Sequence, residues 1–306
     1  MKRFITFGEI MLRLKSPGYE RLLQSQRFEA TFGGGEANVA VSLANYGLDA
    51  AFVTVLPDNP LTDACLRELR SFGVDTGLVV RAAGRLGVYY LEGGAVQRPS
   101  KVIYDREGSA IALAGPGAID WNQVFDGASW FHITGITPAI SQSAADLSRE
   151  AVRIAKERGL TVSCDLNHRK NLWTYGKTAR EVMPDIVRYT DVVVANEEDC
   201  QLSLGLHADS LDNVEAGALD AGHYEKTAAL LMQRFPNVQK VAITMRKSRS
   251  ANHNGWSAAL RTAGGFYTSR HYDITDIVDR VGGGDSFAGG LIYGLNSGRS
   301  DQDALA

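Results

Sequence analysis

The chain has 306 residues, of which 44% are hydrophobic and 22% are charged. This composition is typical of globular proteins and excludes a disordered or fibrous chain. The formal net charge of -3 gives no basic field, so we expect no binding to nucleic acid or to an anionic membrane surface.

The start of the chain and the cysteines indicate a cytoplasmic protein. The first apolar residues are interrupted by Glu9 and Arg13, too early for a signal-peptide core, and no window reaches the roughly 18 apolar residues of a membrane helix. Three cysteines lie far apart without a CxxC pair: Cys65, Cys164 and Cys200. This spacing suits neither a disulfide framework nor a zinc site, so we expect reduced thiols.

Short apolar runs alternate with amphipathic segments along the chain. The runs cover residues 51–56, 130–134, 161–164, 191–195 and 241–244. Runs of this kind are typical of parallel strands that are buried on both faces. The clearest amphipathic segment, 143–158, predicts a helix that ends before Gly159. The alternation predicts an α/β fold with a doubly wound sheet.

Two regions depart from this alternation, at about 11–32 and 87–112. Within the second region, 88–91 and 102–104 have the pattern of strands separated by a glycine-containing turn. We expect the two regions to form a small β lid on the main sheet. A polar stretch over about 207–224 is expected to be a surface insertion.

The first glycine cluster is Gly33-Gly34-Gly35-Glu36-Ala37-Asn38, which opens a predicted helix. We expect a polyol substrate to approach the backbone at Gly34 and Gly35, with Asn38 hydrogen-bonded to a hydroxyl. A dinucleotide-binding GxGxxG motif is excluded, because Asn38 stands where its third glycine belongs. A P-loop is excluded at Gly176-Lys177-Thr178, because the required first glycine falls on Asn171.

The second glycine cluster comprises Gly282, Gly283 and Gly284, which lead through Asp285 into a predicted amphipathic helix. Unpaired N–H groups at such a helix start favour a phosphate. Asp285 is then either a helix N-cap or a base beside this anion site. Three consecutive glycines cost more conformational entropy than a cap requires, which favours the functional interpretation.

The Gly-Gly-Gly-Glu-Ala-Asn segment together with Asp279-Arg280-Val281-Gly282-Gly283-Gly284-Asp285-Ser286-Phe287 resembles the two signatures of the PfkB (ribokinase-like) carbohydrate kinases. The resemblance covers the whole chain. It implies one domain over 1–306, a ribokinase-like three-layer α/β/α doubly wound sheet with a β lid. It also implies an ATP-dependent sugar kinase, with Gly282, Gly283 and Gly284 as the anion hole and Asp285 as the base.

The resemblance also implies a nucleotide and magnesium site. The expected nucleotide contacts are Asn167, Asn196, Thr244, Arg246, Gly282 and Gly284. The family's Asn-x-x-Glu motif, which places Mg²⁺ largely through water, reads Asn196-Glu197-Glu198-Asp199 here, so either Asp199 or Glu198 is the metal residue. Arg246 is either a phosphate contact or a solvated strand end. Because Arg280 stands where threonine is frequent, potassium dependence is not predicted.

The expected substrate follows from residues that resemble the 2-keto-3-deoxygluconate kinase subgroup: Tyr89, Tyr104, Arg106 and Arg169. A guanidinium holds a carboxylate through two hydrogen bonds, which a neutral sugar does not need. Arg106 and Arg169 are therefore our candidates for the carboxylate of a sugar acid, and a contact of Arg169 with the γ-phosphate is the alternative.

Several alternatives stay open from the sequence. Within the kinases they are a fructokinase, a ribokinase, a 5-dehydro-2-deoxygluconokinase or a nucleoside kinase. Relatives continue for several tens of residues past the helix that begins near Ser300, so the sequence predicts a shortened C-terminus that lacks part of the adenine pocket. A weakly active, sugar-acid-binding regulatory protein is the alternative from another class. We also expect a homo-oligomer formed through the lid, because exposed strand edges favour pairing.

Overall fold

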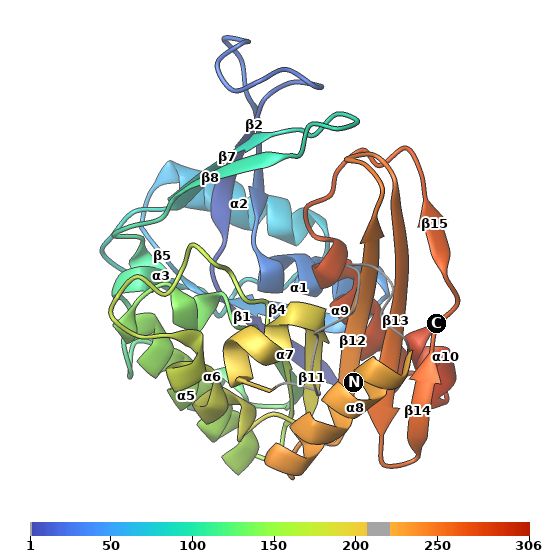
Figure 1. Ribbon diagram of the computed structural model, residues 1–306. Coiled ribbons are helices and arrows are strands. Elements are labelled where there is room, and N and C mark those ends of the chain that lie inside the picture. Colours follow the sequence, from blue (N-terminus) through green and yellow to red (C-terminus); the bar gives the residue numbers. More distant parts are fainter. Residues whose placement is uncertain (1, 207–220) are drawn as a thin grey trace.

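The computed structural model describes residues 2–206 and 221–306. Its centre is a sheet of nine strands (Figure 1). In order, its strands are β14 (Gly265–Thr268), β13 (Asn254–Thr262), β12 (Lys240–Ser248), β11 (Val192–Asn196), β10 (Thr161–Asp165), β9 (Ala128–Thr134), β1 (Arg3–Phe7) and β4 (Asp49–Val53). β15 (Tyr272–Ile274) pairs with β13. The strands from β12 to β4 are parallel, and β13, β14 and β15 add an antiparallel edge.

Helices cover both faces of this sheet, which confirms the three-layer α/β/α fold. One face packs against α1 (Gly35–Asn45), α2 (Pro60–Ser71), α9 (Gly283–Asn296) and α10 (Asp301–Leu305). The other face packs against α3 (Ala110–Leu113), α4 (Trp121–Val124), α5 (Gln142–Glu157), α6 (Ala179–Val187), α7 (Glu197–Leu204) and α8 (Ala221–Arg234). The largest apolar cluster lies between this second layer and the sheet, where Phe7, Phe131 and Ile133 are fully buried.

Local sequence signals account for the ends of the clearest helix. The side chain of Ser141 accepts the N–H of Ala144 and caps α5 at 3.0 Å. At its other end Gly159 adopts φ +77°, a left-handed conformation that favours glycine. The helix predicted over 143–158 is thus confirmed within one residue.

A second sheet of four strands forms the lid and projects above the core in Figure 1. Its order is β3 (Glu29–Gly33), β2 (Met11–Lys15), β7 (Gly87–Glu92) and β8 (Lys101–Asp105). The final residues of the region expected over 87–112 form α3, whose Ile111 packs in the core. A short pair, β5 (Val55–Leu56) and β6 (Val80–Arg81), lies outside both larger sheets.

All three cysteines are free and buried. The insertion expected over about 207–224 lies outside the described residues, except that 221–224 begin α8. Among residues 2–206 and 221–306, none of the helices combines the length and the apolar character needed to cross a membrane.

Candidate active site

A cavity of about 620 Å³ is lined both by the lid and by the carboxyl ends of the parallel strands. β1 lies between β9 and β4, so the order of strands reverses at this point of the sheet. Ligands of open α/β sheets bind in the crevice beyond the strand ends at such a reversal. The fold therefore places this cavity where a binding site is expected.

Every residue that the sequence predicts for the site lines this one cavity. These are Gly34, Gly35, Asn38, Tyr89, Tyr104, Arg106, Asn167, Arg169, Asn196, Glu198, Asp199, Thr244, Arg246, Gly282, Gly283, Gly284 and Asp285. They come from segments far apart in the chain. The fold brings these segments together at one cavity, where the two glycine clusters also meet.

The second glycine cluster forms a turn into α9. Gly282 is the residue before the helix and has φ +88°, a conformation that requires little energy only for glycine. Asp285 lies in the first turn, and no side chain caps the helix. The interpretation of Asp285 as an N-cap is therefore wrong, and the first N–H groups of α9 have no partner within the helix.

Asp285 is 9% exposed and is held by a residue of the first glycine cluster. The Nδ2 group of Asn38 donates a hydrogen bond of 2.7 Å to Oδ2 of Asp285. Burial raises the pKa of Asp285, whereas the Asn38 hydrogen bond and the charge of Arg169 lower it. In this structure Asn38 orients the candidate base, and its hydrogen bond to a substrate hydroxyl stays a prediction.

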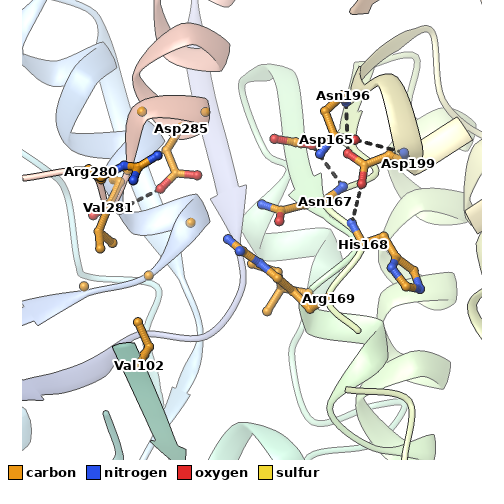
Figure 2. Close-up of a pocket in the computed structure, with 18 of the residues that line it drawn as sticks. Val102, Asp165, Asn167, His168, Arg169, Asn196, Asp199, Arg280, Val281 and Asp285 are labelled. Atoms are coloured by element: carbon orange, nitrogen blue, oxygen red, sulfur yellow. Dashed lines mark hydrogen bonds between the residues drawn. The ribbon is translucent and has the colours of Figure 1, made fainter. Parts of the chain in front are cut away.

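Figure 2 shows a second group of carboxylates across the cavity from Asp285, with Arg169 extending between the two sides. Asp165 is the last residue of β10 and is 7% exposed. Burial raises its pKa well above the ordinary value, and the negative charges of Asp199 and Asp285 raise it further. The cavity thus gathers carboxyl groups that hinder one another's ionisation, and a bound cation would favour their charged forms.

The two candidate metal residues differ in their surroundings. Asp199 is buried, and its oxygens accept the backbone N–H groups of Asn196 and His168, both at 3.0 Å. Glu198 is exposed and lines the cavity. Within the described ranges, no three His, Cys, Asp or Glu side chains form a ligand cluster. This arrangement fits Mg²⁺, which retains waters and needs only one or two carboxylates beside phosphate oxygens.

On the side of the antiparallel edge, the cavity is lined by Thr244 and Arg246 of β12 and by Trp256 of β13. Arg246 is exposed and pairs in register with Trp256. An added Cβ at Gly283 would lie 3.8 Å from the ring of Trp256, so the indole borders the glycine turn. This wall combines a cationic group with an aromatic surface beside the anion site.

The lid contributes an aromatic and basic wall. The rings of Tyr89 and Tyr104 lie 5.8 Å apart, and the guanidinium of Arg106 lies 4.5 Å from the centre of the Tyr104 ring.

At Gly34, an added Cβ would lie 2.0 Å from the carbonyl oxygen of Glu9. A side chain at position 34 would collide with the backbone of Glu9, so the protein's own fold requires glycine at this position.

Several residues that line the cavity were not assigned a role from the sequence, among them Glu9, Asp165 and Trp256. Asp165 carried a usable signal, because it ends a buried apolar run whose carboxyl end faces the site. Glu9 and Trp256 carried none, since their places depend on the lid and on the β12–β13 hairpin, which bring distant segments together.

Comparison with known proteins agrees with this geometry. The sequence pattern of the pfkB family carbohydrate kinases matches residues 1–306. The structure of a 2-dehydro-3-deoxygluconokinase from Thermotoga maritima has a TM-score of 0.92 and 46% identity, over 100% of this chain and 90% of that one.

Two curated relatives match over nearly the whole chain. The 2-dehydro-3-deoxygalactonokinase of Haloferax volcanii is 34% identical over 99% of this chain and 87% of its own length. The 2-dehydro-3-deoxygluconokinase of Bacillus subtilis is 28% identical over 98% and 85%. With its two glycine clusters meeting at one cavity, the chain belongs to the pfkB family of carbohydrate kinases.

Proposed function

We propose that this protein transfers the γ-phosphoryl group of ATP to a hydroxyl of a sugar acid, converting 2-keto-3-deoxygluconate to its 6-phosphate. The observation that carries the proposal is that one cavity holds the buried Asp285 beside an open helix start together with Arg106 and Arg169, two of the arginines that line it. A base beside an anion site serves any kinase. Two guanidinium groups suit a substrate that carries a carboxylate.

Phosphoryl transfer requires the protein to align the attacking oxygen with the γ-phosphate and to stabilise the negative charge that spreads over it. Asp285 accepts the proton of the substrate hydroxyl. The N–H groups at the start of α9, next to Gly282, Gly283 and Gly284, stabilise the transferred phosphoryl group. The ionised form of Asp285 is favoured by Asn38 and Arg169, which oppose the effect of burial.

The remaining polar residues of the cavity are assigned to the two substrates. Asn167, Asn196, Thr244 and Arg246 face the nucleotide phosphates, while Tyr89, Tyr104 and Arg106 face the sugar acid. Mg²⁺, when bound with ATP, neutralises phosphate charge. Glu198 and Asp199 would hold it largely through water, and the charge of Asp165 would add to its attraction.

The relatives support this class of substrate and leave its stereochemistry to experiment. The Thermotoga and Bacillus proteins are named for 2-dehydro-3-deoxygluconate, and the Haloferax protein is named for 2-dehydro-3-deoxygalactonate. These two acids differ only in the configuration of C4, and both carry the same carboxylate and the same terminal hydroxyl. Because ATP is the donor, we propose that the reaction takes place in the cytoplasm. A homo-oligomer formed through the lid stays a prediction.

The test is an assay of ADP release with Mg-ATP and a panel of acceptors. The panel contains 2-keto-3-deoxygluconate, its C4 epimer, 5-dehydro-2-deoxygluconate, fructose, ribose and adenosine. Turnover with 2-keto-3-deoxygluconate should exceed turnover with the others. The variant Asp285→Asn should lower kcat by about 10² to 10⁴, the usual contribution of a general base, while thermal stability changes little.

Other outcomes would point elsewhere. A preference for fructose, ribose or adenosine would refute the assignment of the two arginines to a carboxylate. A preference for the C4 epimer would retain the mechanism and correct the sugar. Binding of the keto acid by calorimetry without turnover would favour the regulatory protein instead.

A further inference from the structure

Glu9 is a buried acid for which phosphoryl transfer has no use. It lies on the short connection between the core strand β1 and the lid strand β2, and it is 3% exposed. A buried carboxylate is costly unless partners compensate its charge. The contacts of Glu9 at the junction of core and lid should therefore show what compensates its charge.

Those contacts join three passages of the chain between core and lid. Oε2 of Glu9 lies 3.3 Å from Nη1 of Arg106, and Oε1 accepts a hydrogen bond of 3.2 Å from the hydroxyl of Ser109. Both partners lie on the connection that leaves β8 for α3. Gly87, the first residue of β7, passes so close that an added Cβ would lie 3.0 Å from Oε1 of Glu9.

Arg106 contacts these neighbours, but some of its N–H groups have no hydrogen-bond acceptor among the described residues. Its side chain is 11% exposed and packs over the ring of Tyr104 at 4.5 Å. Within the described residues, its Nε and Nη1 groups have no hydrogen-bond acceptor, because the contact with Glu9 is close but poorly aligned. Buried donors without an acceptor are unfavourable, so a ligand that supplies acceptor oxygens would complete this site.

We propose that Glu9 is a positioning residue, which fixes the guanidinium of Arg106 so that its unpaired N–H groups receive the carboxylate of the sugar acid. The inference rests on the proposed function and adds a specificity residue to it. Arg106 follows the end of a lid strand and carries a long, flexible side chain. Glu9 follows the end of a buried core strand, and its own side chain is 2% exposed, so it supplies a fixed point.

Two effects of Glu9 on the substrate oppose each other. Its negative charge competes with the substrate for Arg106, which weakens binding. Its fixed position pre-orients the guanidinium, which strengthens binding because less freedom is lost when the carboxylate arrives. The misaligned contact leaves the N–H donors available, so the competition is reduced to charge alone and orientation predominates.

The experiment measures KM and kcat for 2-keto-3-deoxygluconate in a double-mutant cycle. Glu9→Gln should raise KM about tenfold, because a guanidinium that is no longer fixed loses about one hydrogen bond to the substrate carboxylate, with kcat changed less than about threefold and KM for ATP unchanged. Arg106→Met should raise KM more. If Glu9 acts through Arg106, the double variant should have the KM of Arg106→Met alone rather than the product of the two effects.

Glu92→Gln is the matched control, because Glu92 pairs with Arg98 at 3.8 Å on the same lid but does not line the cavity. It should leave KM unchanged. An unchanged or lower KM in Glu9→Gln, or multiplicative effects in the double variant, would overturn the role of Glu9. If wild-type protein does not phosphorylate the keto acid at all, the proposed function itself has failed, which is a distinct result.

A folding defect is a foreseeable complication, because Glu9→Gln leaves Arg106 without its charged partner. Ser109→Ala provides the second measurement. It removes the hydrogen bond that orients Glu9 but keeps the charge, and it should raise KM in the same direction by about threefold. No change in KM in a folded Ser109→Ala protein would also count against the proposal.

Discussion

Arg13 and Asp279 form an ion pair between the lid and the turn before α9, although they are 266 residues apart in the chain. Arg13 belongs to the lid strand β2. Asp279 begins the turn that leads into α9, and its Oδ1 accepts the N–H of Val281 at 2.9 Å. One carboxylate thus connects the lid to the turn that carries the anion site.

Loss of this ion pair should loosen the lid and leave the chemistry intact. For Arg13→Gln we expect kcat/KM for the sugar to fall about two- to fivefold, since partly exposed ion pairs contribute up to about 1 kcal/mol. Activity of the wild type should also decline as salt rises, because salt screens the pair, and the variant should respond less. Lys15→Gln is the control, since Lys15 pairs with Glu29 at 3.6 Å within the lid. Equal salt dependence in wild type and Arg13→Gln would contradict this role.

The hydrogen bond from Asn38 to Asp285 predicts a change in pH dependence. Asn38 stabilises the ionised carboxylate, so Asn38→Leu should raise the pKa of Asp285 above its already raised value. The proposed base is active only when ionised, so the acidic limb of the kcat/KM profile should move to higher pH. At neutral pH the loss should be roughly tenfold, as expected for a hydrogen bond to a charged group. A lower rate with an unmoved acidic limb would show that Asn38 acts elsewhere.

Glu36 predicts a pH dependence of stability rather than of activity. Its Oε1 accepts hydrogen bonds from the N–H and the hydroxyl of Thr134, at 3.0 and 2.8 Å, and from the hydroxyl of Thr137 at 3.0 Å. Burial nevertheless raises the pKa of Glu36 from its ordinary value of 4.5 to about 7. The folded protein therefore binds this proton more tightly than the unfolded chain does.

Because the pKa of Glu36 is raised in the folded state, the contribution of Glu36 to the stability of the protein is fully present below about pH 4.5. This contribution is lost as the pH rises through about 7. Glu36→Gln keeps an acceptor oxygen but cannot ionise. The free energy of unfolding, measured with urea at pH 4.5 to 8, should fall more steeply for the wild type, by on the order of 3 kcal/mol over this range. Glu157→Gln, on the exposed surface of α5, should retain the wild-type slope. Parallel curves for wild type and Glu36→Gln would refute the prediction.

The sequence predicted the fold best where burial alone determines the pattern. The run 130–134 lies within β9 and 161–164 within β10, because strands buried on both faces are continuously apolar. The antiparallel edge was not predicted. β13 mixes polar and apolar residues, β14 and β15 are partly or wholly exposed, and the identity of all three depends on pairing with β12 and with one another.

The site was predictable where it follows a strand end or a glycine turn. Asp285 and Asn38 were found in this way, but the hydrogen bond between them was not, because nothing local in either cluster indicates that they meet. A second reason for glycine at Gly34 was not predicted, while the approach of a substrate to its backbone stays a prediction. The sequence shows that space is needed there, whereas only the fold shows that Glu9 fills it.

The two sheets divide the work of the site between them. The lid strands carry Tyr89 and Tyr104, and Arg106 follows them, whereas Asp285 and its glycine turn belong to the core. A change of acceptor therefore requires new residues chiefly in two excursions of the chain, 11–33 and 87–106, and at the position of Arg169 on the core. These excursions can change during evolution while Asp285 and its glycine turn stay the same. A protein engineer who wishes to alter the substrate range can graft the same two segments.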